Sequence, residues 1–381
     1  MIYLDYAADT PVSQTVLTAF LSAAREQVAN PNSDHVLGLN AKWRLNQATE
    51  HIARMLSAQP NEVVMTSSAT EANNLAILGA AHAYQSRGRH LITSPMEHAS
   101  VTGPMTALKN EGFELEYMKV LPDGRADIAH LKSLLRPDTV LVSLCAVDSE
   151  VGVIQDLESV RKALTVFPNC RLHVDATQAV GKLPVELGSA DLMTLSPHKF
   201  YGITGSGMLI VKDGIRLAPL WYGGTGATPY RSGTPALALT VAMEAALEEA
   251  LKHLVERLES VQRLNLRLRE ELGCLRFVTL NSPANASPYI MNFSVSGIRA
   301  RDLIALLSDN GICVSSKSAC CAPNAPSHPV MAMTGDRKRA MNTLRVSLSH
   351  LTSESEIDQF LLELKKCAAS LEASHGKQPE D

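Results

Sequence analysis

Between residues 62 and 212 the chain alternates short apolar runs with longer amphipathic segments. Apolar runs of roughly four to eight residues are typical of buried strands, whereas apolar residues at helical spacing indicate helices. The runs predict strands at 62–66, 90–93, 115–120, 140–147, 172–174, 192–195 and 208–211, and the amphipathic segments predict helices at 71–85, 101–110, 127–135 and 157–164. Strands separated by helices of this length form βαβ units, so we expect a mostly parallel sheet.

The C-terminal part of the chain has a different pattern. A long helical stretch at 235–272 leads away from the predicted sheet. It is followed by strand-like segments at 289–295, 312–315 and 343–349 and by helical segments at 300–308 and 354–370. We therefore predict an α/β fold with a large, mostly parallel-sheet domain, residues 12–250, and a smaller C-terminal α/β domain, residues 1–11 with 251–381, linked by the long helix.

Composition narrows the class of protein. Of the 381 residues, 45% are apolar and 19% are charged, which suits two folded domains rather than disorder. The net charge is −4, aromatic residues make up 4% and no long basic run occurs, so neither nucleic acid nor a membrane is an expected partner. The first residues lack the features of a signal peptide, and no run is apolar for the length of a membrane span. Seven cysteines without a C-x-x-C pair argue against disulfides and a zinc site, so we expect a reducing, cytoplasmic location.

A lysine follows one of the predicted strands and precedes a glycine-rich loop. The segment Ser-Pro-His-Lys at 196–199 lies between the strand at 192–195 and the loop at 202–207. Any single lysine is most often a solvated surface residue. At a strand end beside hydroxyl and imidazole groups, however, Lys199 suits a Schiff-base lysine, whose amine must lose its proton more easily than it does in water.

An aspartate ends another predicted strand, in the segment His-Val-Asp-Ala-Thr-Gln at 173–178. As a structural residue, Asp175 would cap a turn or a helix. As a functional residue, it would pair its carboxylate with the ring nitrogen of pyridoxal 5'-phosphate (PLP), which keeps the ring able to accept electrons. The 24-residue interval from Asp175 to Lys199 leaves room for one crossover, so the two residues together are a more specific signal than either alone.

The segment Ser-Ser-Ala-Thr-Glu-Ala-Asn at 67–73 begins a predicted helix. Ser68 and Glu71 fit a capping box, in which each side chain accepts a hydrogen bond from the backbone of the other end. A capped helix start also presents free N–H groups and the positive end of the helix dipole, which commonly bind phosphate. Thr70 would add its hydroxyl, so the structural and functional interpretations are compatible.

Nine segments occur in the order found in one known family. They are Asp5-x-x-Ala8 with Thr10-Pro11, Asn30-Pro31-x-Ser33-x-His35-x-x-Gly38, Ser68-Ala69-Thr70-Glu71, Glu97-His98, Val174-Asp175-Ala176-Thr177-Gln178, His198-Lys199, Arg231-Ser232-Gly233-Thr234, Ser318-Ala319-Cys320 and Arg345-x-Ser347-Leu348. With these segments the chain resembles the NifS/IscS-like cysteine desulfurases of the class V aminotransferase superfamily, from about residue 3 to residue 366. The resemblance implies the PLP-dependent transferase fold type I.

The resemblance assigns most of these residues to the cofactor. It implies that Lys199 binds PLP covalently, that Asp175 faces the ring nitrogen, and that His98 stacks on the ring and helps to move protons. It further implies that Gln178 lies near the ring hydroxyl and that Ser149 lies close to the cofactor. The phosphate would be held by Ala69, Thr70, Ser196 and His198, joined by Thr234 from the other subunit of a homodimer with active sites at the interface.

The resemblance also implies L-cysteine as substrate, bound by Asn30 and Arg345, with the guanidinium paired to the carboxylate. Cys320, as a thiolate, would attack the substrate sulfur and become a persulfide while alanine is released, so we expect a lowered thiol pKa or a nearby base. A free cysteine is usually a small buried residue. Cys320 instead lies in a Ser/Ala/Pro/Asn-rich stretch, 315–329, that predicts an exposed mobile loop. The sulfur would pass to an acceptor protein of unknown identity, as in iron–sulfur cluster biosynthesis.

The chain departs from the family at several positions. Asp148 and Ser149 stand where the family usually has two asparagines, and Asp9 stands where threonine is common. Cys321 directly follows Cys320, and we interpret it as a bystander because adjacent side chains point in different directions. These departures keep two alternatives open: a selenocysteine lyase or another PLP-dependent lyase or aminotransferase on the same fold, and a non-catalytic binding or scaffold homologue.

Overall fold

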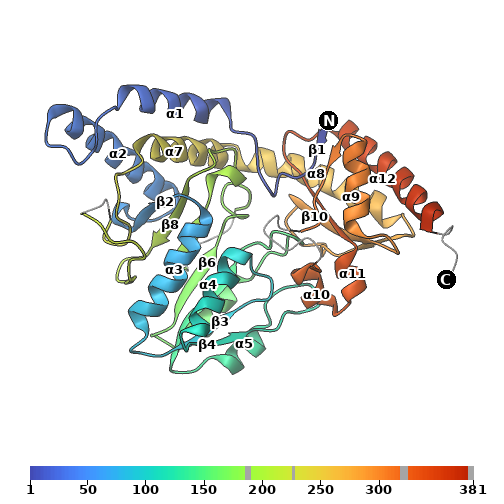
Figure 1. Ribbon diagram of the computed structural model, residues 1–381, viewed down its shortest axis with the longest axis horizontal. Helices are drawn as coiled ribbons and strands as arrows, with labels where there is room; N and C mark the ends of the chain where they lie inside the picture. The colour runs from blue at the N-terminus through green and yellow to red at the C-terminus, as the bar shows by residue number, and fades with distance from the viewer. Residues whose placement is uncertain (185–189, 225–227, 318–324, 376–381) are drawn as a thin grey trace.

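A seven-stranded sheet forms the centre of the larger part of the molecule (Figure 1). The computed structural model describes residues 1–184, 190–224, 228–317 and 325–375. In spatial order the strands are β2 (Val63–Thr66), β8 (Gly207–Val211), β7 (Leu192–Leu195), β6 (Arg171–Asp175), β5 (Thr139–Cys145), β3 (His90–Thr93) and β4 (Glu114–Tyr117). All run parallel except β8, which is antiparallel to both of its neighbours. The predicted mostly parallel sheet is therefore confirmed.

Helices cover both faces of this sheet, as strands that are buried throughout require. Apolar side chains on one face pack against α3 (Ala69–Tyr84) and α4 (Ala99–Asn110). Those on the other face pack against α6 (Leu157–Leu164) and α7 (Leu237–Lys252), with α5 (Ile128–Leu134) beside α6. All seven residues of β5 are buried, which explains why its sequence is a continuous apolar run rather than an alternating one.

Two N-terminal helices lie outside the predicted elements. The helices α1 (Gln14–Glu26) and α2 (Val36–Met55) pack on the outer side of α7 (Figure 1). From α1 and α2 the buried side chains of this contact are alanines, Ala23, Ala41 and Ala48, which pack against Leu237 and Val241 of α7. The large apolar residues at the start of α2 are exposed instead, with Trp43 at 64% and Val36 at 67%. This helix therefore buries alanine and exposes tryptophan, the reverse of the usual amphipathic pattern.

The smaller part of the molecule is built on two short sheets. One is antiparallel, in the order β12 (Thr343–Ser347), β10 (Ile290–Val295) and β9 (Val278–Leu280), and the other pairs β1 (Ile2–Tyr3) with β11 (Ile312–Cys313) in parallel. Helices α8 (Leu254–Gly273), α9 (Ala300–Asp309) and α12 (Glu354–His375) pack around them. The chain start thus lies beside C-terminal strands, although the division at residues 12 and 250 stays a prediction.

The helical stretch predicted at 235–272 is two helices rather than one. The helical hydrogen bonding of α7 ends at Lys252 and that of α8 begins at Leu254, because His253 between them has φ −103° and ψ 11°. Helix α7 packs against α1, α2 and the turn that follows β7 of the large sheet, whereas α8 packs on β9 and β10. The pair therefore connects the two parts of the molecule, as the single predicted helix would.

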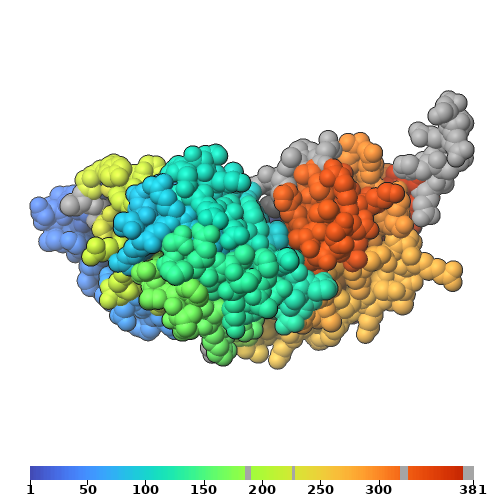
Figure 2. Space-filling model, turned by 90° about the horizontal axis from the view of Figure 1, so that it is seen from below, coloured from blue at the N-terminus to red at the C-terminus, as the bar shows by residue number. Residues whose placement is uncertain are grey.

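The smaller part also covers one side of the larger one. Figure 2 shows the orange-red segment with α10 (His328–Thr334) and α11 (Arg337–Met341) against the green and teal surface of the larger part. Val330 and Ala340 of these helices are buried with Met96, Cys145 and Val153, which follow or end strands of the large sheet. The loop predicted for 315–329 ends before residue 329, because α10 begins at His328. Among the described helices, none has the length and apolar character needed to span a membrane.

Candidate active site

A cavity of about 280 Å³ opens where the strands β2, β3, β5, β6 and β7 of the large sheet end. Loops that follow neighbouring parallel strands leave the sheet at the same edge, so residues far apart in sequence meet there. The cavity is closed by the chain start and by β12 of the smaller part. Nine of the residues predicted from the sequence line it: Ala69, Thr70, His98, Ser149, Asp175, Gln178, His198, Lys199 and Arg345.

Lys199 lies in a single 3-10 turn, Pro197–Lys199, directly after β7. Its amine donates hydrogen bonds to the carbonyl oxygens of Ala7 (2.9 Å) and Ala8 (2.5 Å), so the chain start holds the side chain in the cavity. Burial, followed by the positive charge of Arg345, lowers the pKa of Lys199 to about 8, although the carboxylates of Asp9 and Asp5 oppose this shift. The amine therefore has a substantial neutral fraction at physiological pH, which attack on an aldehyde requires.

Asp175 is the last residue of β6, and its carboxylate is fixed on both sides. One oxygen accepts a hydrogen bond from the backbone N–H of Thr177 (3.0 Å), and the other accepts one from the amide of Asn73 (2.8 Å). The same Asn73 amide donates to Ser100 Oγ (2.8 Å), which in turn lies 2.8 Å from His98 Nδ1. A buried hydrogen-bond chain thus joins the two predicted cofactor residues, Asp175 and His98, through two residues that the sequence does not single out.

His98 also begins a helix. As the N-cap of α4, it accepts a hydrogen bond at Nδ1 from the backbone N–H of Ser100 (3.1 Å). An acceptor at Nδ1 assigns the ring proton of the neutral imidazole to Nε2. Burial lowers the pKa of His98, which keeps the ring neutral near pH 7.

The start of α3 faces the same cavity. Ser68 caps the helix by accepting a hydrogen bond at Oγ from the backbone N–H of Glu71 (3.2 Å). Glu71 itself accepts from the backbone N–H of Ser67 (2.7 Å) and pairs with Arg231, instead of accepting from the backbone N–H of Ser68. Only the Ser68 half of the predicted capping box therefore forms. Gly207 of β8 lies so close that a Cβ there would stand 2.3 Å from the Ser68 carbonyl carbon. Ser68, Ala69 and Thr70, the cap and the first residues of α3, line the cavity, and the first N–H groups of a helix lack partners within the helix.

His198 completes this end of the cavity. Its Nδ1 lies 2.8 Å from Oγ of Ser196, which is fully buried beneath the cavity rather than lining it. Burial and the nearby Lys199 lower the pKa of His198 to about 4, so the ring is neutral and donates through one nitrogen. The hydroxyl of Thr177, which also lines the cavity, is buried without a hydrogen-bond partner in the described part of the chain. These groups fit PLP. The unpartnered Thr177 hydroxyl and the start of α3 suit its phosphate, and the near-neutral Lys199 suits its aldehyde.

Arg345 projects from β12 and is 2% exposed. Its guanidinium pairs with the carboxylate of Asp5 (2.7 Å) and donates to the backbone carbonyl of Ser149 (2.8 Å). The Nε–H of Arg345 is buried and has no acceptor among the described residues. The guanidinium therefore retains a donor for a further anion in the cavity.

The departures Asp148 and Ser149 lie in the turn after β5. Asp148 is buried, and one of its carboxylate oxygens accepts backbone N–H bonds from Glu150 (3.1 Å) and Val151 (2.5 Å). Burial, with the neighbouring Glu150, raises the pKa of Asp148 to about 7. Because an asparagine oxygen could accept the same two bonds, this chain carries a titrating acid at a position where an amide would suffice.

Besides Ser196, three predicted site residues lie outside the cavity or beyond the described residues. Asn30 and Thr234 are exposed and line a separate hollow beside the start of α7. Cys320 lies in the segment 318–324, outside the described residues. Its described neighbours are anchored, because Ser315 pairs with Arg345 through backbone bonds of 3.2 and 2.6 Å.

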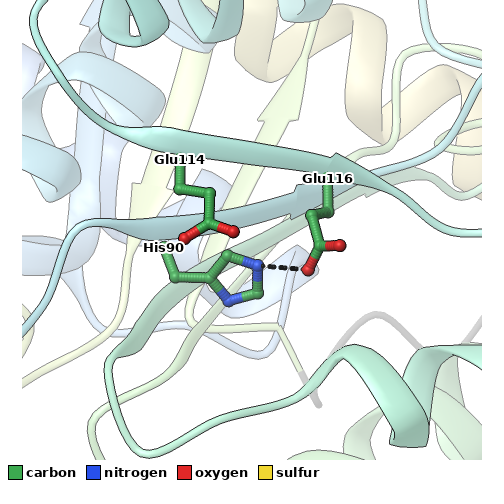
Figure 3. Close-up of side chains that lie close together, drawn as sticks. All are labelled: His90, Glu114 and Glu116. Atoms are coloured by element: carbon green, nitrogen blue, oxygen red, sulfur yellow. Dashed lines mark hydrogen bonds and ion pairs between the residues drawn. The ribbon is translucent and has the colours of Figure 1, made fainter.

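One further group of side chains has the composition of a metal site. His90, Glu114 and Glu116 lie close together on β3 and β4 (Figure 3), far along the sheet from the cavity. His90 is hydrogen-bonded to Glu116 (2.9 Å) and to Thr139 (2.8 Å), and Arg136 binds both oxygens of Glu114 at 3.0 and 2.6 Å. These contacts already satisfy the histidine and neutralise one carboxylate, so we assign no ion to this group.

Comparison with known proteins identifies the family. A family model described as "Aminotransferase class-V" matches residues 2–360. The chain is 34% identical to "Cysteine desulfurase IscS" of Dictyoglomus turgidum over 97% of this chain and 95% of the relative. Among solved structures, a "NifS-like protein" matches with 33% identity and a TM-score of 0.90 over 97% of this chain and 99% of the other, and "SspA in complex with cysteine" matches with 31% identity and a TM-score of 0.81 over 93% and 100%. The chain therefore belongs to the class-V aminotransferase family and, within it, to the NifS/IscS-like cysteine desulfurases.

Proposed function

We propose that this protein is a PLP-dependent cysteine desulfurase that converts L-cysteine to L-alanine and transfers the sulfur to Cys320 and then to an acceptor. One observation carries the proposal. A near-neutral lysine, a fixed aspartate, a capped helix start and a buried arginine line the same cavity, in a chain whose relatives bear the name cysteine desulfurase. The lysine suits the aldehyde of PLP, the aspartate its ring nitrogen and the helix start its phosphate. The arginine suits the carboxylate of the substrate.

The residues that would hold PLP are distributed around the cavity. Lys199 would bind the aldehyde, Asp175 the ring nitrogen and Gln178 the ring hydroxyl. The phosphate is assigned to Ala69, Thr70 and His198, which line the cavity, and by resemblance alone to Ser196, which lies beneath it against His198. When bound, the cofactor supplies an electron sink that stabilises negative charge at the substrate Cα.

The substrate carboxylate is assigned to Arg345, whose buried Nε–H lacks an acceptor among the described residues. A relative that was solved as "SspA in complex with cysteine" supports L-cysteine as the ligand. Ser149 holds the guanidinium through its backbone carbonyl, so the short side chain at this position does not weaken that contact. Asn30, which is exposed, is assigned to the substrate by resemblance alone.

Two residues of the cavity can move protons. Lys199 Nζ, with a pKa near 8, can accept the proton from the substrate Cα and return it to carbon. His98 carries its proton on Nε2, because Nδ1 is held as an acceptor by the start of α4. The fixed orientation of His98 makes it a donor rather than a base in its resting state.

The sulfur step is assigned to Cys320. Its thiolate attacks the sulfur of cysteine, and an S–S bond forms as the C–S bond breaks. The electron pair of the C–S bond stays with carbon, which takes up a proton and leaves as alanine. Ser315, five residues before Cys320, is paired to Arg345 beside the cavity, and five residues can span at most about 16–18 Å.

A homodimer is the proposed assembly. Exposed apolar side chains cluster at the start of α2, where Val36, Leu37, Leu39 and Trp43 are between 54% and 67% exposed. Exposed apolar groups of this size commonly mark an interface. A second subunit docked on this face would bury them, and its Thr234 is proposed to reach the phosphate. The sulfur acceptor is proposed to be a protein met in the cytoplasm.

Incubation of the PLP-loaded protein with L-cysteine and reductant tests this function. We expect alanine in amounts far above the protein concentration, with the cofactor recovered as PLP. Pyruvate, or a keto acid with the cofactor left as pyridoxamine phosphate, would instead identify another lyase or an aminotransferase. Faster turnover of selenocysteine than of cysteine would identify a selenocysteine lyase, and failure to bind PLP would leave a non-catalytic homologue.

A further inference from the structure

A buried lysine outside the predicted site lies directly behind the cavity. Lys182 is 5% exposed, and its amine donates a hydrogen bond to Oε1 of Gln178 (2.8 Å). The ammonium also lies 5.8 Å from the ring centre of Tyr289. In the described part of the chain no carboxylate lies within ion-pair distance of it. A lysine in this setting is unusual, because a buried ammonium is normally paired with an acid.

The surroundings of Lys182 are also electrostatically unfavourable. Burial, together with the positive charges of Lys199 and Arg345, lowers the pKa of Lys182 to about 7. An apolar residue of similar length would avoid this cost entirely. The presence of lysine here therefore points to a task that an apolar side chain cannot perform.

The position of Gln178 suggests what that task is. Its Nε2 donates to the carbonyl oxygen of Ala7 (2.9 Å), the same oxygen that accepts from Lys199 Nζ (2.9 Å). The amide NH₂ and the catalytic amine therefore lie side by side. In PLP the ring hydroxyl is adjacent to the aldehyde carbon that the lysine would bind, so a donor beside Lys199 Nζ would be placed to reach that hydroxyl oxygen.

An amide can also present its carbonyl oxygen in the opposite orientation, and that orientation would repel the hydroxyl oxygen. Two contacts fix the orientation here: the Ala7 carbonyl accepts from Nε2, and the Lys182 amine donates to Oε1 at the other end of the amide, which holds the NH₂ group on the side of Ala7 and Lys199. The backbone fixes the spacing of the two side chains: Lys182 N–H donates to the Ala179 carbonyl (3.1 Å), and Gly181 turns the chain at φ +73°. A Cβ at Gly181 would stand 2.9 Å from the Cβ of Ala250, so this turn packs directly on α7.

We propose that Lys182 is a positioning residue, which holds the Gln178 amide with its NH₂ group toward the ring hydroxyl of the cofactor. The proposal rests on the assignment of this cavity to PLP. When PLP is bound, a donor at its hydroxyl oxygen would stabilise the negative charge there, and the neighbouring Schiff-base proton would then be lost at lower pH.

The test is the pH titration of the visible absorbance band of the PLP-loaded protein, measured for the wild type, Lys182→Met, Gln178→Leu and Lys182→Arg. We expect Lys182→Met and Gln178→Leu to raise the titration midpoint by a similar amount, about one pH unit, which is the scale of one hydrogen bond to a charged group. Lys182→Arg, which keeps a charged donor, should stay close to the wild type. If Lys182→Met does not fold, Lys182→Gln replaces it, and its uncharged donor should give a smaller shift in the same direction.

An unchanged midpoint in Lys182→Met would overturn the proposal. A shift in Lys182→Met without one in Gln178→Leu would also overturn it, because the ammonium would then act on the cofactor through its charge alone. Alanine production by the wild type separates these results from failure of the proposed function. A wild type that forms alanine with an unshifted Lys182→Met variant refutes only the role of Lys182, whereas a wild type without a visible band refutes both.

Discussion

The buried amide of Asn73 is the part of the site whose removal has the most clearly defined effect on the free energy of unfolding. It is 0% exposed, and its Nδ2 donates both to Asp175 and to Ser100. In Asn73→Ala the bond to the charged carboxylate, about 1.5–3 kcal/mol, and the neutral bond, about 1 kcal/mol, are both lost. The better helix propensity of alanine returns about 0.5 kcal/mol. The expected net loss in the free energy of unfolding is about 2–3.5 kcal/mol.

The adjacent Asn74 provides a matched control. It lies on the same helix but is partly exposed, and its amide donates to the backbone carbonyl of Thr70 (2.9 Å). Asn74→Ala gains the same helix propensity and should change stability by less than about 0.5 kcal/mol. Urea unfolding of both cofactor-free variants gives the difference in their free energies of unfolding, provided that the dependence on urea concentration has the same slope in both. Asn73→Ala should also bind PLP more weakly because Asp175 loses a fixed partner. Equal stability of the two variants would refute the buried network.

Three further predictions concern charge. Arg345→Lys should raise the KM for cysteine by roughly 10- to 100-fold with a smaller effect on kcat, since lysine cannot reproduce the planar donor set of arginine; an unchanged KM would move the carboxylate site elsewhere. The rate at which cofactor-free protein captures PLP should rise with pH around a midpoint near 8, the pKa of Lys199, and a midpoint near 10 would contradict the burial argument. Asp148 has a pKa of about 7 in the folded protein and about 4 in the unfolded chain. Between these pH values the folded protein retains a proton that the unfolded chain releases, so stability falls as the pH rises from about 4 to about 7. Asp148→Asn should therefore be more stable than the wild type by a few kcal/mol at pH 7 and equal to it near pH 4; a gain independent of pH would count against this titration.

Hydrophobic patterning predicts the large sheet well, because both faces of its strands are covered and their sequences are nearly all apolar. It does not reveal that β8 runs antiparallel, since strand direction depends on the connection and not on the residues within the strand. The helices α1 and α2 escape prediction because small residues form their contact with α7 while Trp43 faces outward. The break between α7 and α8 falls at a single residue, His253, and no proline or glycine marks it.

The site could be predicted where a residue type is unusual in its setting. Lys199 and Asp175 stand at strand ends, and Arg345 belongs to a segment that the family resemblance carries. The supporting residues Asn73, Ser100 and Lys182 carry no comparable signal, because their roles depend on burial and on partners distant in sequence. Only Asn73 had a hint, as it belongs to the segment that begins α3.

The carrier of the sulfur is the central claim, and alanine formation by Cys320→Ser tests it most directly. The wild type, Cys320→Ser and the matched control Cys321→Ser are loaded with PLP and incubated with L-cysteine and reductant. We predict that the wild type and Cys321→Ser form alanine at similar rates, whereas Cys320→Ser binds PLP normally and forms almost none. Equal alanine from Cys320→Ser and the wild type would contradict sulfur transfer through Cys320.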